Sequence, residues 1–335
     1  MPDWLVFVAP LIAASLVLLL AFAGCDFKPG MLSLSDLMFY ERPTGTGEFW
    51  RTDGQGGVAL IGETHTDWRT SWVLITPGGF GGGAQLLFYD RRAGEGEFWA
   101  VNGGGMSLVG ETNTGWRSDW TLIVPGHFSD GPHTDLLFYE RSTGQGEFWS
   151  SNGDGTISLI GATNFGWRTS WQLIVPGNFS DSDYTDLLFY DRDAGEGEFW
   201  SANGDGTISM IGETNTGWRT SWARILSGSF LDGSDYSDLL FYDRAAGQGE
   251  FWRTGGDGGI VMPGETNTDW RTSWANIVPG YFSDQSSFTD LLFYDAQGGT
   301  GEFWASNGGG GVHQIGASHT DWRTDWFIIT TGSYQ

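Results

Sequence analysis

The feature that most constrains this chain is a pattern of about 50 residues that occurs six times. Each copy contains Leu-Leu-Phe-Tyr or a close variant, with its phenylalanine at Phe39, Phe88, Phe138, Phe189, Phe241 and Phe293. Ten residues later comes the phenylalanine of Gly-Glu-Phe-Trp, at Phe49, Phe98, Phe148, Phe199, Phe251 and Phe303. A fixed period of this length predicts an array of similar units that bury their apolar faces against one another.

Each copy contains four short apolar runs separated by turn residues. A Gly-x-Gly turn such as residues 45–47 lies between the first two runs, where glycine allows the positive φ of a tight hairpin. An Asn-Gly or Asp-Gly turn, such as Asn152-Gly153, precedes the third run at residues 157–160. A Trp-Arg segment then leads to a fourth run, as at residues 173–175. Four strands in each of six units, without helical periodicity, predict a β-propeller.

The end of the chain indicates how the ring closes. Tyr334 follows Trp326 by eight residues, the same interval that separates Trp72 from Phe80, so the C-terminus supplies one more strand. That strand has no successor and is expected to complete the first blade. The prediction is an all-β propeller of six four-stranded blades over residues 26–335, with repeats beginning near residues 36, 85, 135, 186, 238 and 290.

Residues 1–25 form a separate segment. It is almost continuously apolar and ends in Ala23-Gly24-Cys25, which resembles a bacterial lipoprotein signal with Cys25 as the lipidated residue. An uncleaved N-terminal apolar helix that anchors the chain in a membrane is the alternative. Both interpretations predict an exported protein, secreted or membrane-anchored at the cell surface.

Composition excludes some classes of function. The formal charge is −25, with 16 Lys and Arg against 41 Asp and Glu, so nucleic acid is not an expected partner. Cys25 is the only cysteine, which excludes a disulfide within the chain. No single constellation of catalytic side chains stands out from the repeats, so neither an enzyme nor a cofactor is expected.

Several linked motifs in each copy resemble those of the PLL-type bacterial propeller lectins. They are Asp-Leu-Leu-Phe-Tyr-Asp-Arg at residues 186–192, Gly-Glu-Phe-Trp at 197–200, Thr-Gly-Trp-Arg-Thr-Ser-Trp at 216–222 and Ile-Val-Pro-Gly-Asn-Phe at 174–179. The resemblance implies a carbohydrate-binding lectin that recognises fucose-like or galactose-like glycans on cell surfaces or glycoproteins. It implies grooves between blades as the sites and no metal. This chain has six repeats, whereas that group usually has seven.

Sugar binding needs an exposed aromatic ring beside fixed polar groups. The Trp-Arg pairs and the Glu-Thr-Asn-Thr segments before them provide both kinds of group. The candidate sugar-binding residues are Trp68, Arg69, Trp116, Arg117, Trp167, Arg168, Trp218, Arg219, Trp270, Arg271, Trp322 and Arg323, with Glu63, Glu111, Glu213, Glu265, Asn113, Asn215 and Asn267. An equally open interpretation is that these tryptophans pack between sheets and that the arginines pair with carboxylates.

Two other functions are consistent with the sequence. A propeller can present a flat face as a scaffold for binding another protein. Loops such as the one holding Asp181, Asp183 and Asp186 could bind calcium, although residues 81–85 contain no carboxylate.

Overall fold

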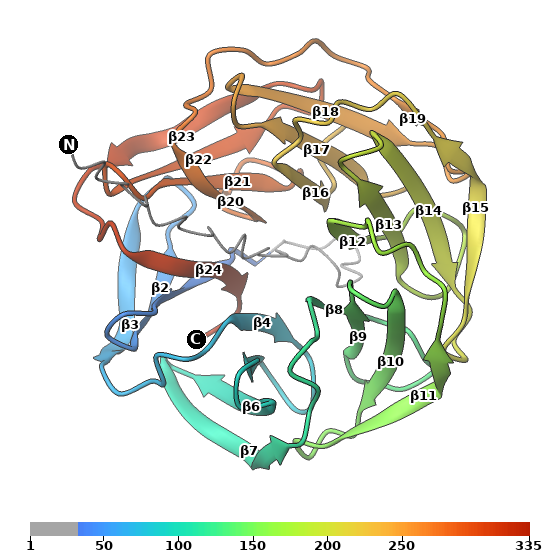
Figure 1. Cartoon of the computed structure of the whole chain (residues 1–335). Helices are drawn as coiled ribbons and strands as arrows, with labels where there is room; N and C mark the ends of the chain where they lie inside the picture. The colour runs from blue at the N-terminus through green and yellow to red at the C-terminus, as the bar shows by residue number, and fades with distance from the viewer. Residues whose placement is uncertain (1–32) are drawn as a thin grey trace, which may run out of the picture.

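The structure is a computed structural model that describes residues 33–335. The predicted N-terminal apolar helix and Cys25 lie outside the described residues. Every regular element in the described part is a β-strand, and 24 strands form six four-stranded antiparallel sheets arranged in a ring (Figure 1). The described part holds no helix with the length and hydropathy needed to cross a membrane. The predicted six-bladed propeller is confirmed.

Blade 1 consists of β24, β1, β2 and β3, and each later blade uses four consecutive strands from β4 onward. The innermost strands are β24 (Trp326–Gly332), β4 (Leu74–Gly78), β8 (Leu122–Gly126), β12 (Leu173–Gly177), β16 (Arg224–Gly228) and β20 (Trp274–Gly280). The second strands are β1 (Asp36–Glu41), β5 (Gln85–Asp90), β9 (Asp135–Glu140), β13 (Asp186–Asp191), β17 (Asp238–Asp243) and β21 (Asp290–Asp295).

The third strands are β2 (Thr46–Thr52), β6 (Glu95–Asn102), β10 (Gln145–Ser151), β14 (Glu196–Ala202), β18 (Gln248–Thr254) and β22 (Thr300–Ser306). The outermost strands are β3 (Val58–His65), β7 (Gly105–Thr114), β11 (Ile157–Asn164), β15 (Ile208–Asn215), β19 (Ile260–Val261) and β23 (Val312–His319). In blade 5 the outermost strand is only two residues long, and Pro263, which has no amide hydrogen to donate, follows shortly after it.

The last strand closes the ring, as predicted. β24 pairs with β1 in antiparallel register, with Leu37 opposite Thr331 and Phe39 opposite Ile329. The side chain of Tyr334 is fully buried, and its amide donates to the Asp36 carboxylate at 2.8 Å. Two ends of the described chain are thereby tied into one sheet (Figure 1).

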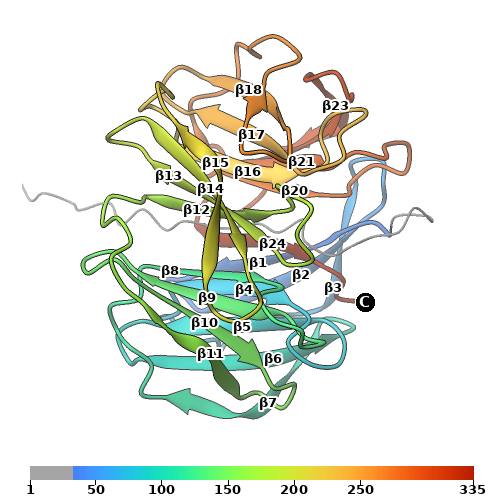
Figure 2. The same ribbon diagram turned by 90° about the vertical axis from the view of Figure 1, so that its right-hand side faces the viewer.

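Apolar clusters between neighbouring sheets hold the blades together. Figure 2 shows these sheets stacked face to face. Because side chains alternate along a strand, successive residues of β5 serve different clusters. Leu86 and Phe88 face blade 1, and Leu87 and Tyr89 face blade 3. Both faces of the second strand are therefore buried in every blade, which explains its uninterrupted apolar sequence.

The two ends of the propeller carry different connections. Antiparallel strands alternate in direction, so two kinds of connection lie at the same end of the propeller. They are the links between blades, such as residues 66–73, and the turns between second and third strands, such as residues 91–94. We call this end the link face. All the predicted sugar-binding tryptophans and arginines lie on it.

Candidate functional site

The first tryptophan of each link packs against the blade it follows. The ring of Trp68 covers Gly47, where an added Cβ would come within 2.3 Å of the ring, and it meets Phe88 of the next blade edge-on at 5.2 Å. The first glycine of the Gly-x-Gly motif has the expected positive φ, 69° at Gly45. The second glycine serves a different purpose, since only a residue without a side chain leaves room for the indole. These tryptophans are partly buried wedges between blades.

The arginine after each tryptophan lies in an ion-pair network. The Arg69 guanidinium stacks on the Trp72 ring at 4.8 Å and pairs with Glu97 of blade 2 at 2.5 Å. The largely buried Glu97 also accepts hydrogen bonds from Trp99 Nε1 and Thr112 Oγ1, each at 2.9 Å. The same arrangement recurs for Arg168, Arg219 and Arg271, with Glu198, Glu250 and Glu302 as their partners. A buried carboxylate with three donors is fully satisfied by the protein itself.

The predicted asparagines connect neighbouring blades. Asn113 Nδ2 donates to the carbonyl oxygen of Gly155 at 2.8 Å, and Asn215 and Asn267 donate in the same way to Gly258 and Gly310, each at 2.9 Å. A ring nitrogen of His65 makes the equivalent bond to Gly104 O at 2.8 Å. A side-chain N–H donor is the property that asparagine and histidine share at this position. The exchange of asparagine for histidine at this position is visible in the sequence, but the carbonyl oxygen that accepts the hydrogen bond lies in the next blade.

The predicted glutamates Glu63, Glu111, Glu213 and Glu265 are exposed. Within residues 33–335 they make no hydrogen bond or ion pair with another side chain. The structure therefore brings the tryptophans and arginines together but shows no hydrogen bond or ion pair between them and these four glutamates in residues 33–335. Of the loop carboxylates considered for calcium, Asp186 accepts from Phe179 N at 2.8 Å and Asp181 accepts from Tyr236 Oη at 2.9 Å.

Blades 1 and 3 depart from the common pattern. In four links a serine precedes the buried tryptophan and donates to the aspartate that ends the second strand, as Ser273 Oγ does to Asp295 at 2.6 Å. In the other two links this serine is replaced by Asp119 or Asp325, and the second strand ends in Glu140 or Glu41. The two exchanges occur together, so a hydroxyl–carboxylate pair becomes a pair of carboxylates.

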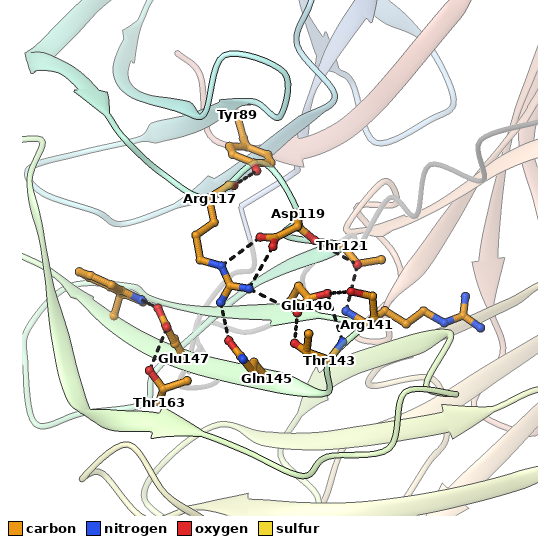
Figure 3. Close-up of polar contacts among 12 residues, drawn as sticks. Tyr89, Arg117, Asp119, Thr121, Glu140, Arg141, Thr143, Gln145, Glu147 and Thr163 are labelled. Carbon is orange, nitrogen blue, oxygen red and sulfur yellow. Dashed lines mark hydrogen bonds and ion pairs between the residues drawn. The ribbon is translucent and has the colours of Figure 1, made fainter.

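Arg117 holds the carboxylate pair of blade 3 together (Figure 3). Its Nε and one Nη lie 3.0 and 3.1 Å from Asp119, and that Nη lies 3.3 Å from Glu140. Burial opposes the charge of this guanidinium, but the hydrogen bond and charge of Asp119 raise the pKa of Arg117 above its ordinary value. Glu140 is buried, whereas 54% of the Asp119 side-chain surface is exposed. One carboxylate is enclosed and the other faces solvent.

Blade 1 has the same pair beside a groove. Arg323 pairs with the buried Glu41 at 2.6 Å, and Asp325 is exposed. The groove is shallow and largely open to solvent, has a volume of about 650 Å³, and lies on the link face. Its lining residues are Arg42, Pro43, Thr70, Thr324, Asp325, Trp326 and Phe327. The Arg42 guanidinium lies 5.3 Å from the Phe327 ring centre and donates through Nε to Thr70 O at 3.3 Å.

This groove combines a cation, a carboxylate, two hydroxyls and an aromatic wall in the size range of small-molecule sites. Sequence reasoning missed it. The available signal was the paired departure of Asp325 and Glu41 from the repeats, but these residues are 284 positions apart. Only ring closure brings them to one blade. No group of three or more metal-ligating side chains is found within residues 33–335.

Comparison with known proteins gives the fold a wider context. No family model matches the chain, and no curated protein does. A periplasmic gluconolactonase of Pseudomonas aeruginosa is 12% identical, with a TM-score of 0.54, covering 90% of this chain and 100% of its own. A putative 6-phosphogluconolactonase from Bacteroides uniformis is 13% identical, with a TM-score of 0.52, covering 86% and 83%. A virginiamycin B lyase from Staphylococcus aureus is 12% identical, with a TM-score of 0.44, covering 85% of each chain.

These comparisons contradict two predictions made from the sequence. Two of the similar propellers are named as a gluconolactonase and a putative 6-phosphogluconolactonase, and the predicted carbohydrate-binding lectin is corrected on that finding. The expectation that the chain is not an enzyme is corrected on the same finding. Identities of 12 and 13% establish a shared fold, so the chemistry has to be argued from this chain's own residues. The resemblance to PLL-type propellers and the export of the chain remain predictions.

Proposed function

We propose that this propeller is a hydrolase that opens a small cyclic ester in the groove of blade 1. The observation that carries the proposal is the exposed carboxylate of Asp325 in a groove that also contains Arg42. The names of two similar propellers, a gluconolactonase and a putative 6-phosphogluconolactonase, suggest a lactone as the class of substrate.

Ester hydrolysis needs a base for water and a positive group for the oxygen that becomes charged. Asp325 is suited to take the proton from an attacking water, because within residues 33–335 no cation lies within 4 Å of its carboxylate. Water would add to the ester carbonyl, the ring C–O bond would break, and the departing oxygen would receive the proton. The product is an open-chain hydroxy acid.

Arg42 is the second functional group of the groove. Its guanidinium rests on the Phe327 ring and is anchored through Nε, so its remaining N–H groups can face a ligand. In that position it would stabilise the negative charge of the tetrahedral intermediate and of the product carboxylate. The ion pair of Arg323 with buried Glu41 holds in place the link that contains Asp325.

The proposal is tested by measuring lactone hydrolysis at constant pH, with glucono-δ-lactone as substrate and the spontaneous rate subtracted. Asp325→Ser introduces the residue that four of the six links carry, so the blade is expected to fold. General-base catalysis predicts a loss of about 100-fold or more in kcat.

Asp119→Ser is the matched control, since it makes the same exchange in blade 3. It should leave the rate unchanged. The proposal fails if the wild-type protein is no faster than buffer across a panel of lactones, or if the two variants lose activity equally.

A further inference from the structure

A second departure from the sixfold pattern lies in blades 4 and 5, across the ring from the groove of blade 1. The innermost strands of blades 2, 3 and 4 have an apolar residue at one position, namely Leu74, Leu122 and Leu173. In blade 5 that residue is Arg224, the first residue of β16. A long cation thus replaces leucine on the inner strand of a propeller with a formal charge of −25.

Arg224 does not stand alone. Burial lowers the pKa of Arg224 to about 10, and the charges of Arg244 and Arg192 act on it in the same direction. Arg224 Nη2 donates to Ala275 O at 3.1 Å, and Arg244 Nε donates to Thr272 O at 3.0 Å. These carbonyls satisfy single N–H groups and supply no negative charge.

The three guanidinium groups lack carboxylate partners in the described part of the chain. The six link arginines all form ion pairs, whereas Arg192, Arg224 and Arg244, like the other arginines outside the links, form none within 4 Å across residues 33–335. The nearby aspartates are engaged elsewhere, since Asp191 accepts from Ser170 and Asp243 from Ser221. Exposed Asp193 accepts from Gln172 at 3.1 Å.

Arg192 provides an independent observation. Its Nε and one Nη are enclosed, and neither finds an acceptor within residues 33–335. Burying donors of a charged group without an acceptor is costly, as is placing cations near one another when none has a carboxylate within 4 Å in residues 33–335. An anion whose oxygens accept from these donors would stabilise this arrangement.

We infer that Arg192, Arg224 and Arg244 form a binding site for a multiply charged oxyanion of the phosphate type. Forked guanidinium groups match phosphate oxygens, and a dianion can accept from all three at once, which a single carboxylate cannot do as well. The site shares no residue with the groove of blade 1, so the inference does not depend on the proposed hydrolase activity.

The test measures thermal unfolding and binding heat of the full chain with inorganic phosphate at constant ionic strength, with acetate as the singly charged comparison. Phosphate at saturating concentration is expected to raise Tm by about 2 °C or more, and acetate by less. Arg224→Leu restores the residue of blades 2 to 4. It should unfold at a higher temperature than the wild-type protein without phosphate and should lose at least about tenfold in phosphate affinity.

Arg141→Ala is the control, because Arg141 also donates to a link carbonyl, Thr169 O at 3.2 Å, but in blade 3. It should bind phosphate as the wild-type protein does. The inference is overturned if phosphate does not stabilise the wild-type protein, if acetate does so equally, or if Arg224→Leu retains full phosphate affinity.

Discussion

Replacing Trp222 with alanine should be among the most destabilising single changes in the propeller. Only 3% of Trp222 is exposed, and its ring lies 5.3 Å from Phe241 and 4.7 Å from the Arg219 guanidinium. Loss of a buried tryptophan costs about 3–5 kcal/mol through lost burial and the cavity left behind. Loss of the stacked cation adds about 0.5–1 kcal/mol at this partly exposed arginine. The sum is about 3.5–6 kcal/mol.

The assay is equilibrium unfolding in urea followed by circular dichroism, which does not depend on the fluorescence of the 19 tryptophans. Trp200→Ala is the matched control. Trp200 is only partly buried, and its indole N–H donates to Glu198 at 3.1 Å, so its loss should cost about 1–3 kcal/mol. If Trp222→Ala proves no more destabilising than Trp200→Ala, the assignment of Trp222 to the core between blades is refuted.

Three further changes probe the packing between blades. Gly197→Ala places a Cβ within 2.3 Å of the Trp218 ring and should lower the free energy of unfolding by about 1–3 kcal/mol, measured in urea; a neutral result would mean that the ring can move aside. Asn215→Ala removes the bond to Gly258 O and should cost about 1–2 kcal/mol, whereas Asn215→His should keep most of it, as His65 does in blade 1. Burial raises the pKa of Asp290 from 3.8 to about 6, and the folded state therefore favours the protonated acid. Its contribution to stability is fully present below about pH 4 and is lost as the pH rises through about 6, which amounts to about 3 kcal/mol for a difference of about 2 in pKa. Asp290→Asn should flatten this part of the profile in thermal unfolding at pH 4 to 7, and an unchanged slope would assign it to other groups.

Much of the fold could be predicted because its signals are local. Ten residues separate Phe39 from Phe49 in the first hairpin, and the glycine turn between them allows few alternatives. The same hairpin repeated six times, with one unpaired strand at the end, leaves ring closure as the arrangement that gives this last strand a partner. The positive φ of Gly45 followed from the same reasoning, whereas the contact of Gly47 with Trp68 did not.

The candidate site could not be predicted in the same way. Asp325 and Glu41 are each ordinary variants within their own repeats, and their positions differ by nearly the whole length of the chain. They meet because Arg323, in the link before β24, pairs with Glu41 at the end of β1. The contacts of the predicted sugar-binding residues could not be predicted for a related reason, since Asn113 donates to Gly155 O and Arg69 pairs with Glu97, both in the neighbouring blade.

The sequence by itself determined the number of blades and the order of their strands, because strand pairing within a blade mostly joins residues that are close along the chain. It also determined the strand that closes the ring, because the repeats leave one strand over at the end of the chain. Tertiary structure alone decided which polar side chains are satisfied and which remain available. Hydrogen bonds and ion pairs between blades depend on how two sheets stack and on which charged groups are buried together between them. That stacking enclosed the carboxylates of Glu97 and Glu198, exposed Asp325 in a groove, and left Arg192 and Arg224 without an ion pair within residues 33–335.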